Sequence, residues 1–426
     1  MLIHINNKQF TDNSNEANKD TIFVVSKHNE KFKQQAVLNA CENFIDSKEL
    51  KDYIDISGIK IIGITGTNGK TTTAAAIYSF LLDLGYKVAL QGTRGFFIND
   101  ERVEDYSLTT PIQLGNFEHI YKAKEQGCEF FVMEVSSHAI EQERIEGLNF
   151  ELKIHTNITR DHLDYHKTVE EYIAVKNSFF SDDSKKLINK DDPNVKFNSK
   201  NCLTYALDAP STYKVNAFSF KEETHVMFNH FSNMHAFTSN LMGVFNIYNI
   251  TAAVAAVHML TKRDLDEICE VVEDFAGVSG RMEIISKNPF IIIDFAHTPD
   301  GMNEVLKSFS HKDIIVVFGA GGNRDIEKRP IMGKIASQFA KHIIVTSDNP
   351  RFEDPDLIME DIIKGITNKE NLVVDINRKS AIKKAIELCD DNSVVLILGK
   401  GDEEYQIIYD QKMPFSDKKI VLELLK

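Results

Sequence analysis

Three features that this sequence lacks exclude several classes of protein at once. Its five cysteines are scattered, odd in number and never spaced as a CxxC pair, so we expect no disulfide framework, no zinc ribbon and a reducing, cytoplasmic location. No stretch reaches the roughly 18 consecutive apolar residues of a membrane-spanning helix. The first residues also lack the basic start and apolar core of a signal peptide, so we expect no targeting segment.

Positive charge is scarce as well. Lysine and arginine together number 49 against 63 aspartates and glutamates, and the net charge of the 426 residues is −14. This charge disfavours general binding to nucleic acid or to an anionic membrane. A small anionic ligand remains compatible, because a phosphate site needs only a few N–H donors and one or two cations. We therefore expect a monomer whose partners are small molecules.

The composition is otherwise that of a soluble α/β protein, and the length suggests two or three domains. We expect a small α/β module over 1–57, with a strand at 21–25 and a helix at about 36–44. Strands and helices then alternate over 58–279 and again over 280–426. This alternation predicts a central doubly wound domain and a Rossmann-like last domain, both with mainly parallel sheets.

Apolar runs and their spacing place the expected elements. A buried strand is predicted at 59–64, and a helix with one apolar face follows over about 74–84 and can end at Gly85. Further central strands are predicted at 88–90, 130–135 and 152–156. The strands of the last domain are predicted at 290–293, 314–318, 343–345, 372–374 and 394–398. The two glycines within 277–280 indicate a hinge between the two larger domains.

Residues 66–71 read GTNGKT between an expected strand and an expected helix. Backbone N–H groups at such a turn bind phosphate, while Lys70 can reach the β- and γ-phosphates and Thr71 can bind Mg²⁺. The strict GxxxxGK[ST] pattern fails, because Ile64 stands where the first glycine belongs. The alternative is a simple turn with a chance lysine. A phosphate loop predicts a nucleoside triphosphate but leaves a GTPase switch, a motor and a kinase equally open.

Three later segments add ionisable groups. Glu134 ends an apolar strand, where a carboxylate can bind a second Mg²⁺, although it could also be exposed to solvent. Residues 160–166 are mostly polar and could be a surface loop, and a zinc site from His162, Asp164 and His166 has no standard spacing. A capping box at Thr168 predicts the start of a further helix. Local features alone predict that Lys176, about two turns into this helix, is exposed to solvent.

Taken together, these segments resemble the Mur ligase family of bacterial cell-wall synthesis. The resemblance is closest to the members that add the third amino acid to UDP-N-acetylmuramoyl-L-Ala-D-Glu, and it covers about residues 59 to 410. Eight motifs carry it in order: 66–72, 134–144, 160–166, 243–249, 280–283, 294–300, 348–351 and 399–403.

The resemblance implies roles for individual residues in the nucleotide and metal sites. The ATP-binding residues would be Gly66, Thr67, Asn68, Gly69, Lys70, Thr71, Thr72, Asn246, Asn249, Arg281 and Asp294. Two Mg²⁺ ions would be held by Thr71, Glu134, His162 and Lys176. Lys176 aligns with a lysine that the family carbamylates to N6-carboxylysine, which reverses the reading from local features. Lys70, Lys176, Glu134 and His162 would form the catalytic set.

The resemblance also implies the substrate contacts. The UDP-muramoyl dipeptide would be bound by Thr109, Thr110, Ser136, Gln142 and Arg144. The incoming amino acid would be meso-diaminopimelate, bound by Arg324, Asp348, Asn349, Arg351, Gly399 and Glu403. Three departures stand out: the first module is short and allows no assignment of uridine contacts, Phe295 replaces a common tyrosine, and Asp402 replaces a usual histidine.

The implied reaction is ATP-driven amide formation through an acyl phosphate. Close alternatives are the same ligase using L-lysine, another Mur ligase, or a folylpolyglutamate synthase-like ligase; a P-loop regulatory ATPase and an inactive scaffold are alternatives of another class. The DNPR run at 348–351 favours diaminopimelate, because an arginine fork binds its distal carboxylate, which lysine lacks. Arg351 could instead pair with Glu353 or Asp354 on a solvated loop.

Overall fold

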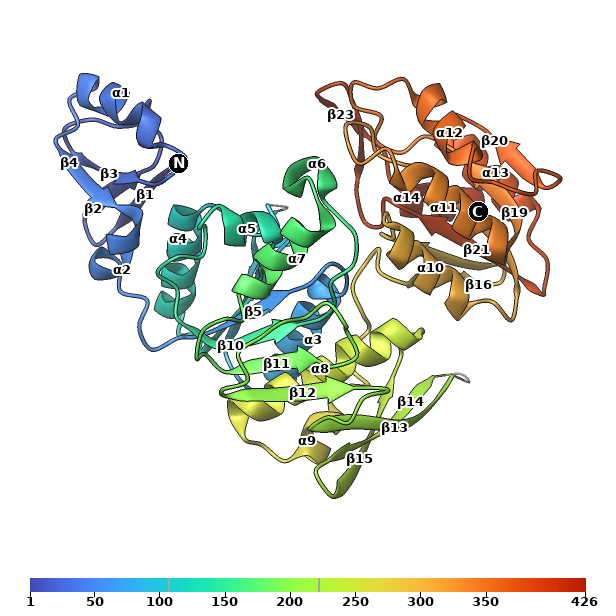
Figure 1. Cartoon of the computed structure of the whole chain (residues 1–426), viewed down its shortest axis with the longest axis horizontal. Coiled ribbons are helices and arrows are strands. Elements are labelled where there is room, and N and C mark those ends of the chain that lie inside the picture. The colour runs from blue at the N-terminus through green and yellow to red at the C-terminus, as the bar shows by residue number, and fades with distance from the viewer. Residues whose placement is uncertain (106–107, 221–222) are drawn as a thin grey trace.

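The structure, a computed structural model, describes residues 1–105, 108–220 and 223–426. Figure 1 shows three bodies in chain order, with the first module at the left, the central domain in the middle and the last domain at the right. Their sheets lie within 2–46, 60–239 and 283–398, apart from a small hairpin after 404. The expected boundaries at 57/58 and 279/280 fall between these sheets, and the division into domains stays a prediction.

The first module is a four-stranded sheet with short helices. Its elements are β1 (Leu2–Ile5), β2 (Lys8–Thr11), β3 (Thr21–Val25), α1 (Lys33–Leu38), β4 (Asn43–Asp46) and α2 (Leu50–Tyr53). The strand expected at 21–25 is confirmed. The helix expected at 36–44 is wrong in its second half, because β4 pairs in parallel with β3 there. Phe44 packs edge-on against the buried Phe23, so a tertiary contact overrides the local helical pattern.

The central domain contains an 11-stranded sheet in the order β15-β14-β13-β12-β11-β10-β5-β9-β6-β7-β8. Its first elements are β5 (Lys60–Thr65), α3 (Lys70–Asp83), β6 (Val88–Gly92), β7 (Gly95–Ile98), β8 (Glu101–Glu104), α4 (Gln113–Glu125), β9 (Phe130–Glu134), α5 (Ser137–Glu141) and β10 (Phe150–His155). The others are α6 (Leu163–His166), α7 (Val169–Ser178), β11 (Lys186–Asn189), β12 (Cys202–Ala206), β13 (Tyr213–Phe220), β14 (Thr224–His230), β15 (Asn233–Ser239), α8 (Val244–Thr261) and α9 (Leu265–Glu270).

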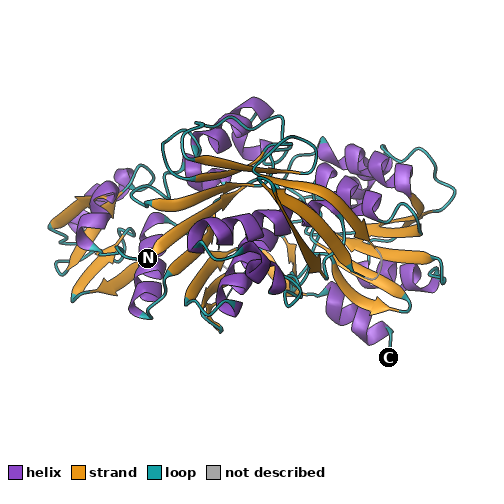
Figure 2. Cartoon of the chain, turned by 90° about the horizontal axis from the view of Figure 1, so that it is seen from below, coloured by secondary structure: helices purple, strands orange, loops and turns teal. Residues whose placement is uncertain are grey.

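The middle of this sheet is parallel, as the sequence predicts. Strand β5 lies between β10 and β9 and pairs in parallel with both. Helices α3 and α8 cover one face, while α4 and part of the first module pack on the other. Figure 2 shows the strong twist of the strands between these helical layers. Both edges are antiparallel, formed by β7–β8 and β13–β15, and the sequence analysis did not anticipate them.

The last domain has a six-stranded sheet in the order β16-β17-β21-β18-β19-β20. Its elements are β16 (Glu283–Lys287), β17 (Phe290–Asp294), α10 (Pro299–Ser308), β18 (Asp313–Phe318), α11 (Lys328–Phe339), β19 (Ala340–Val345), α12 (Pro355–Ile363), β20 (Leu372–Val374), α13 (Arg378–Glu387), β21 (Ser393–Leu398), β22 (Tyr405–Ile408), β23 (Gln411–Pro414) and α14 (Asp417–Leu424). All five predicted strands are confirmed. Helices α10, α11 and α12 pack on one face and α13 and α14 on the other.

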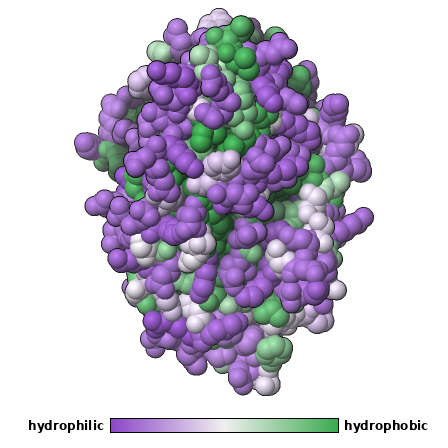
Figure 3. All heavy atoms as spheres, turned by 90° about the vertical axis from the view of Figure 1, so that its left-hand side faces the viewer, coloured by the Kyte–Doolittle hydropathy of each residue, from purple (hydrophilic) through white to green (hydrophobic). Residues whose placement is uncertain are grey.

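Helix α8 is the one helix in the described part of the chain that is long and apolar enough to cross a membrane. Most of it, 72%, is buried inside the fold, where it packs against α3 as a core helix. Exposed apolar side chains occur elsewhere, for example Val37 and Leu38 at the end of α1. Figure 3 faces this end of the molecule and shows a mostly hydrophilic surface with hydrophobic side chains gathered near its top.

Candidate active site

A cavity of about 740 Å³ lies between the central and last domains, at the carboxyl ends of their parallel strands. Most of the residues that the sequence singled out line it. From the central domain these are Thr67, Asn68, Gly69, Lys70, Thr71, Thr72, Thr109, Glu134, His162, Asn246 and Asn249. From the last domain they are Arg281, Asp294, Arg324, Asp348, Asn349, Arg351, Gly399 and Glu403. The remaining predicted residues are not among those that line the cavity: Gly66, Thr110, Ser136, Gln142, Arg144 and Lys176.

The phosphate loop joins β5 to α3 and needs both of its glycines. Gly69 has φ +84°, and a Cβ atom on it would come within 2.3 Å of Asn249 Oδ1. A Cβ atom on Gly66 would lie 1.8 Å from Thr156 Oγ1. The ammonium of Lys70 donates to the carbonyl oxygens of Gly66 at 2.7 Å and Thr67 at 2.9 Å. The lysine is therefore held over the loop without a carboxylate partner among the described residues.

The end of β10 fixes the position of the loop. Thr67 N donates to Asn157 O at 2.7 Å, and Asn68 N donates to Asn157 Oδ1 at 2.9 Å. Thr156 Oγ1 donates to Asn68 O at 2.6 Å. The sequence analysis placed a strand here but missed Asn157, although an asparagine just beyond a strand end was the available signal.

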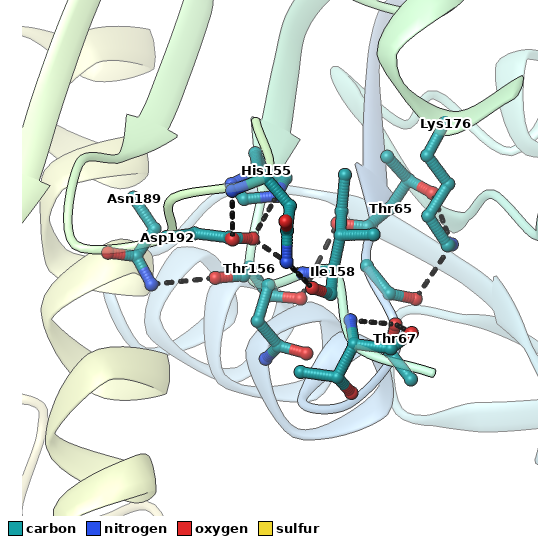
Figure 4. A network of polar contacts seen from close by, with 12 residues as sticks. Thr65, Thr67, His155, Thr156, Ile158, Lys176, Asn189 and Asp192 are labelled. Carbon is teal, nitrogen blue, oxygen red and sulfur yellow. Dashed lines mark hydrogen bonds and ion pairs between the residues drawn. The ribbon is translucent and has the colours of Figure 1, made fainter. Parts of the chain in front are cut away.

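A second layer of polar contacts supports this strand end, as Figure 4 shows. Asn189 Nδ2 donates to Thr156 O at 2.8 Å. Asp192 Oδ2 accepts from Ile158 N at 2.5 Å and lies 3.1 Å from His155 Nε2. His155 is fully buried, and this burial lowers its pKa. The phosphate loop thus rests on a preformed and largely buried scaffold.

Glu134 lies at the end of β9 and is buried, so the reading of a solvent-exposed glutamate is wrong. Its Oε2 accepts from Thr71 Oγ1 at 3.0 Å, and its Oε1 accepts from Thr93 N at 2.9 Å. A buried carboxylate beside a threonine hydroxyl offers the hard oxygen ligands that Mg²⁺ prefers. These two residues therefore fit a magnesium ion next to the phosphate loop.

His162 lies just before α6 with φ +53°. Its Nε2 is 3.3 Å from Asp161 Oδ2, and its ring centre is 5.0 Å from that of His138. Desolvation by the surrounding protein lowers the pKa of His162 to about 3. The imidazole is therefore neutral near pH 7 and keeps a lone pair available for a metal ion.

Lys176 lies near the end of α7, and its side chain is 1% exposed. The reading of a solvated helix lysine is therefore wrong. Its Nζ donates to Gly66 O at 2.9 Å and Thr65 Oγ1 at 3.3 Å, and no carboxylate of the described residues pairs with it. Burial, together with the nearby Lys70 cation, lowers the pKa of Lys176 well below its ordinary value. The buried site therefore favours the neutral form of the Lys176 amine.

The described residues contain no group of three histidine, cysteine, aspartate or glutamate side chains that could hold a metal ion alone. His166 is engaged elsewhere: its Nε2 lies 2.8 Å from Ser137 Oγ and its Nδ1 lies 3.2 Å from Glu141 Oε2. A magnesium ion at Thr71 and Glu134 would consequently need water and phosphate oxygens as further ligands, as is usual for this metal.

The far end of the cavity is formed by α8 and the start of the last domain. Asn249 Nδ2 donates to Asn246 Oδ1 at 3.1 Å, and both side chains are buried. The Arg281 guanidinium stacks 4.1 Å from the centre of the Phe295 ring, so the phenylalanine supplies a cation–π surface. Asp294 accepts from two backbone N–H groups at 2.7 Å, and its burial raises its pKa.

Of the five residues expected at the muramoyl dipeptide, four are joined by hydrogen bonds: Thr110, Ser136, Gln142 and Arg144. Arg144 donates to Gln142 Oε1 at 2.6 Å and to Thr110 O at 2.8 Å. Ser136 N donates to Thr110 Oγ1 at 3.0 Å. Thr109 Oγ1 lies 3.1 Å from Thr93 Oγ1, which connects the group to the Glu134 carboxylate.

The residues expected at diaminopimelate surround loops at the carboxyl ends of β19 and β21. Asn349 Nδ2 donates to Glu403 Oε2 at 2.9 Å, and Lys400 bridges both side chains at 3.1 and 2.8 Å. Gly399 leaves room for Asp348, whose Oδ2 would lie 2.7 Å from a Cβ atom there. Arg324 is more exposed and lies 3.6 Å from Asp164 Oδ2 of the central domain.

The alternative hypothesis that Arg351 pairs with Glu353 or Asp354 on a solvated loop is wrong. Glu353 binds Arg329 at 2.7 Å, and Asp354 caps α12. Arg351 donates to the carbonyl of Gly322 at 2.9 Å, and no carboxylate in the described ranges lies within ion-pair distance of it. Burial and the neighbouring Arg324 lower its pKa. This half-buried cation therefore lacks an anionic partner at one end of the cavity.

Contacts between the two larger domains were missed by the sequence analysis, because they join distant segments. Arg160 of the central domain pairs with Asp325 at 3.1 Å and with Glu327 at 2.7 Å. Arg94 pairs with Asp402 at 3.2 Å. The aspartate that departs from the usual histidine thus has a partner in the opposite domain.

A glycine-rich loop between β5 and α3, a buried carboxylate beside a threonine hydroxyl and a cavity between two α/β domains are the features expected of a nucleotide-dependent enzyme. Comparison with known proteins narrows this class. Residues 64–257 match the Mur ligase middle domain, and residues 280–401 match the Mur ligase, glutamate ligase domain. The chain therefore belongs to the Mur ligase family.

Individual relatives cover nearly the whole chain. A protein of Wolinella succinogenes named UDP-N-acetylmuramoyl-L-alanyl-D-glutamate--2,6-diaminopimelate ligase is 51% identical over 97% of this chain and 95% of its own length. A Helicobacter hepaticus protein of the same name is 48% identical over 94% of this chain and 88% of its own. The solved structure of a protein with that name has a TM-score of 0.69 at 30% identity, over 98% of this chain and 94% of the other. The family, the α/β fold and the ligase activity expected from the sequence are thereby confirmed.

Proposed function

We propose that this protein is the ATP-dependent ligase that adds meso-diaminopimelate to UDP-N-acetylmuramoyl-L-Ala-D-Glu in peptidoglycan synthesis. The observation that carries the proposal is Arg351, a half-buried guanidinium without a carboxylate partner among the described residues, in the same cavity as the phosphate loop. A guanidinium fork binds a carboxylate through two parallel hydrogen bonds, and the distal carboxylate of diaminopimelate supplies that group.

The reaction proceeds in two steps. The glutamate carboxylate of the dipeptide attacks the γ-phosphate of ATP, so that an acyl phosphate forms and ADP leaves. The amine of diaminopimelate then attacks the acyl carbon, phosphate leaves, and an amide bond remains. Lys70 and the loop N–H groups stabilise the charge on the phosphates, while bound Mg²⁺ lowers the repulsion between the carboxylate and ATP. Thr71 and Glu134 would hold one Mg²⁺, and His162 and carbamylated Lys176 would contribute to a second.

Carbamylation of Lys176 suits its surroundings. A neutral amine captures CO₂ with loss of a proton, and the product is an anion that can bind a metal ion, which an ammonium cannot do. The low pKa of Lys176 favours the neutral amine. Carbamylation would place an anion near the Lys70 cation, where a protonated Lys176 would place a second positive charge.

The other predicted residues complete the substrate sites. Asn246, Asn249, Arg281 and Asp294 would contact the nucleotide, and the group around Arg144 would hold the muramoyl dipeptide. Asp348 and Glu403 are suited to the ammonium groups of diaminopimelate, and Arg324 to its second carboxylate. The expected hinge between the domains would lie at Gly277 and Gly280, whose φ angles are +92° and +70°. Closure excludes water from the acyl phosphate. We expect a cytoplasmic location, because all three substrates are soluble small molecules, and we keep the expectation of a monomer.

Phosphate release tests the proposal. The purified protein is given ATP and Mg²⁺ with the UDP-muramoyl dipeptide, with a folate or with neither, and with meso-diaminopimelate, L-lysine, L-glutamate or no amine. We expect release only when the dipeptide and meso-diaminopimelate are both present. Release without the dipeptide would indicate a regulatory ATPase, release with lysine would indicate the lysine-adding ligase, and release with a folate and glutamate would indicate a folylpolyglutamate synthase.

A further inference from the structure

A buried row of polar side chains connects the loop of Arg144 to an ionisable pair at the edge of the central sheet. Its members are Asn116 and His119 on α4 and Gln91 on β6, and none of them is more than 2% exposed. They do not line the active-site cavity. Burying three polar side chains is costly unless their hydrogen bonds are satisfied, so their arrangement requires an explanation.

Backbone carbonyls fix the direction of every hydrogen bond in this row. Asn116 Nδ2 donates to the carbonyls of Pro111 at 3.2 Å and Arg144 at 2.8 Å, so its Oδ1 must point the other way. Gln91 Nε2 donates to that oxygen at 2.8 Å. The Oε1 of Gln91 is therefore left facing His119 Nδ1 at 2.8 Å, and Nδ1 must carry a proton.

The other ring nitrogen of His119 faces a carboxylate. Its Nε2 lies 3.2 Å from Glu104 Oε2, at the end of β8. Because Nδ1 is already a donor, this contact is favourable only when Nε2 is protonated as well and His119 is an imidazolium. The charged groups around it are Glu104 from β8, and Glu118 and Lys122 from α4 itself.

The neighbouring strand leaves the ring little freedom. Phe96 on β7 stacks parallel to the imidazole with ring centres 4.2 Å apart. Lys122 lies 2.9 Å from Glu118 and 3.5 Å from Glu104, so it competes with His119 for the latter carboxylate. Burial lowers the pKa of His119, which places formation of the Glu104 pair on the acid side of neutrality.

Both ends of the row lead to the segments that we expect at the dipeptide. Asn116 holds the carbonyls of Pro111 and Arg144, and the Arg144 side chain binds the carbonyl of Thr110. Glu104 precedes the segment of Thr109 and Thr110 by only a few residues. The Asn116 end of the row therefore holds the substrate-binding group from behind through hydrogen bonds, and the Glu104 end precedes the same group along the chain.

We propose that Gln91, Asn116 and His119 are positioning residues for the UDP-muramoyl dipeptide, and that protonated His119 tightens the site through Glu104. The inference rests on the proposed function, since the dipeptide is the ligand that Arg144 and Thr110 would bind. The three residues act through Arg144 and Thr110 and touch no reacting atom. They consequently influence binding of the dipeptide and leave the phosphate and amine ends of the cavity unchanged.

Three substitutions separate the two hydrogen bonds of His119. His119→Phe keeps the stacking on Phe96 but removes both bonds. His119→Asn restores a donor near the Nδ1 position and leaves Glu104 without its partner. Glu104→Gln removes the ion pair and retains the buried row. Initial rates are measured for each variant with varied UDP-muramoyl dipeptide, ATP and meso-diaminopimelate, from pH 6 to pH 8.5, beside thermal unfolding.

We expect His119→Phe to raise the KM for the dipeptide by roughly tenfold, because Gln91 loses a buried partner. Its kcat and its KM for ATP should stay within about twofold of the wild type. His119→Asn should recover most of the lost affinity. The wild-type KM for the dipeptide should rise with pH from the acid end of this range, by up to about threefold as His119 loses its proton, and His119→Asn and Glu104→Gln should lack that rise.

An unchanged KM for the dipeptide in His119→Phe would overturn the inference, and so would equal losses for all three substrates. If His119→Phe does not fold, the pH profiles of His119→Asn and Glu104→Gln decide: a wild-type rise in either one contradicts the proposal. A wild-type protein that does not turn over the dipeptide at all would contradict the proposed function instead, so the two failures are distinguishable.

Discussion

Lys176 and Arg351 are both basic side chains withdrawn from bulk water, and neither has a carboxylate partner among the described residues. The difference between them lies in their chemistry. Lys176 is fully buried behind the phosphate loop, where a lowered pKa lets it become neutral. Arg351 is half-buried in the last domain and cannot lose its proton at physiological pH, so only an anionic ligand can satisfy it. We therefore interpret unpaired Lys176 as the proposed site of carbamylation and unpaired Arg351 as the proposed partner of a substrate carboxylate.

The largest effect is expected at Lys70, the lysine of the phosphate loop that lies near Lys176. Lys70→Ala removes the ammonium over the loop and should abolish ATP turnover, by at least about a thousandfold. Steady-state phosphate release measures the effect. The Lys70 side chain lines an open cavity, so its loss leaves no sealed void, and the circular dichroism spectrum should match that of the wild type. Surviving turnover would contradict the assignment of the phosphate loop.

Lys176→Ala tests the lysine half of the comparison. The variant should lose most of its activity, on the order of a hundredfold, because a metal ligand is missing. Added acetate or another small carboxylate should restore part of it, since a free carboxylate can occupy the vacated position. Mass spectrometry of the intact wild type at neutral pH, with bicarbonate present, should show the added CO₂. Full activity in Lys176→Ala would exclude the carbamylated role.

Lys176→Met should abolish activity but increase the stability of the fold, and the change in stability is expected to be small. In buffer freed of CO₂, removal of the buried amine should raise the free energy of unfolding by about 1 kcal/mol while activity is lost. Because folding lowers the pKa of Lys176, the unfolded chain binds that proton more tightly, and the wild type gains stability as pH rises between the two pKa values. The advantage of the methionine variant should therefore be larger at pH 6 than at pH 9. Urea unfolding at both values measures it, and an equal or reversed difference would contradict the lowered pKa.

Local sequence patterns were sufficient for the parallel strands and for the glycine-rich turn between β5 and α3. Strands such as β5 and β18 are continuous apolar runs followed by turn residues, and their sequence alone predicts burial on both faces. Strands β4 and β13 to β15 are short or carry many polar residues, and pairing with neighbouring strands stabilises them. That pairing is not visible in a local window.

Site residues divide in the same way. The position of Glu134 at a strand end could be predicted from the apolar run before it. The burial of Lys176 depends on the packing of α7 against the phosphate loop, which no local pattern shows. Only the family resemblance pointed to that lysine. Contacts such as Arg94 with Asp402 join the central and last domains over a long stretch of chain, and no local pattern predicts them.

A competition between two amines tests the arginine half of the comparison, and with it the proposed function, most directly. Wild type and Arg351→Ala are each given the UDP-muramoyl dipeptide, ATP, and meso-diaminopimelate and L-lysine at equal concentration, and the products are separated by mass. The wild type should form the diaminopimelate product in excess by a factor on the order of a thousand, since lysine leaves the Arg351 guanidinium unpaired. Arg351→Ala should lose most of this preference. Comparable use of lysine by the wild type, or an undiminished preference in the variant, would contradict the account.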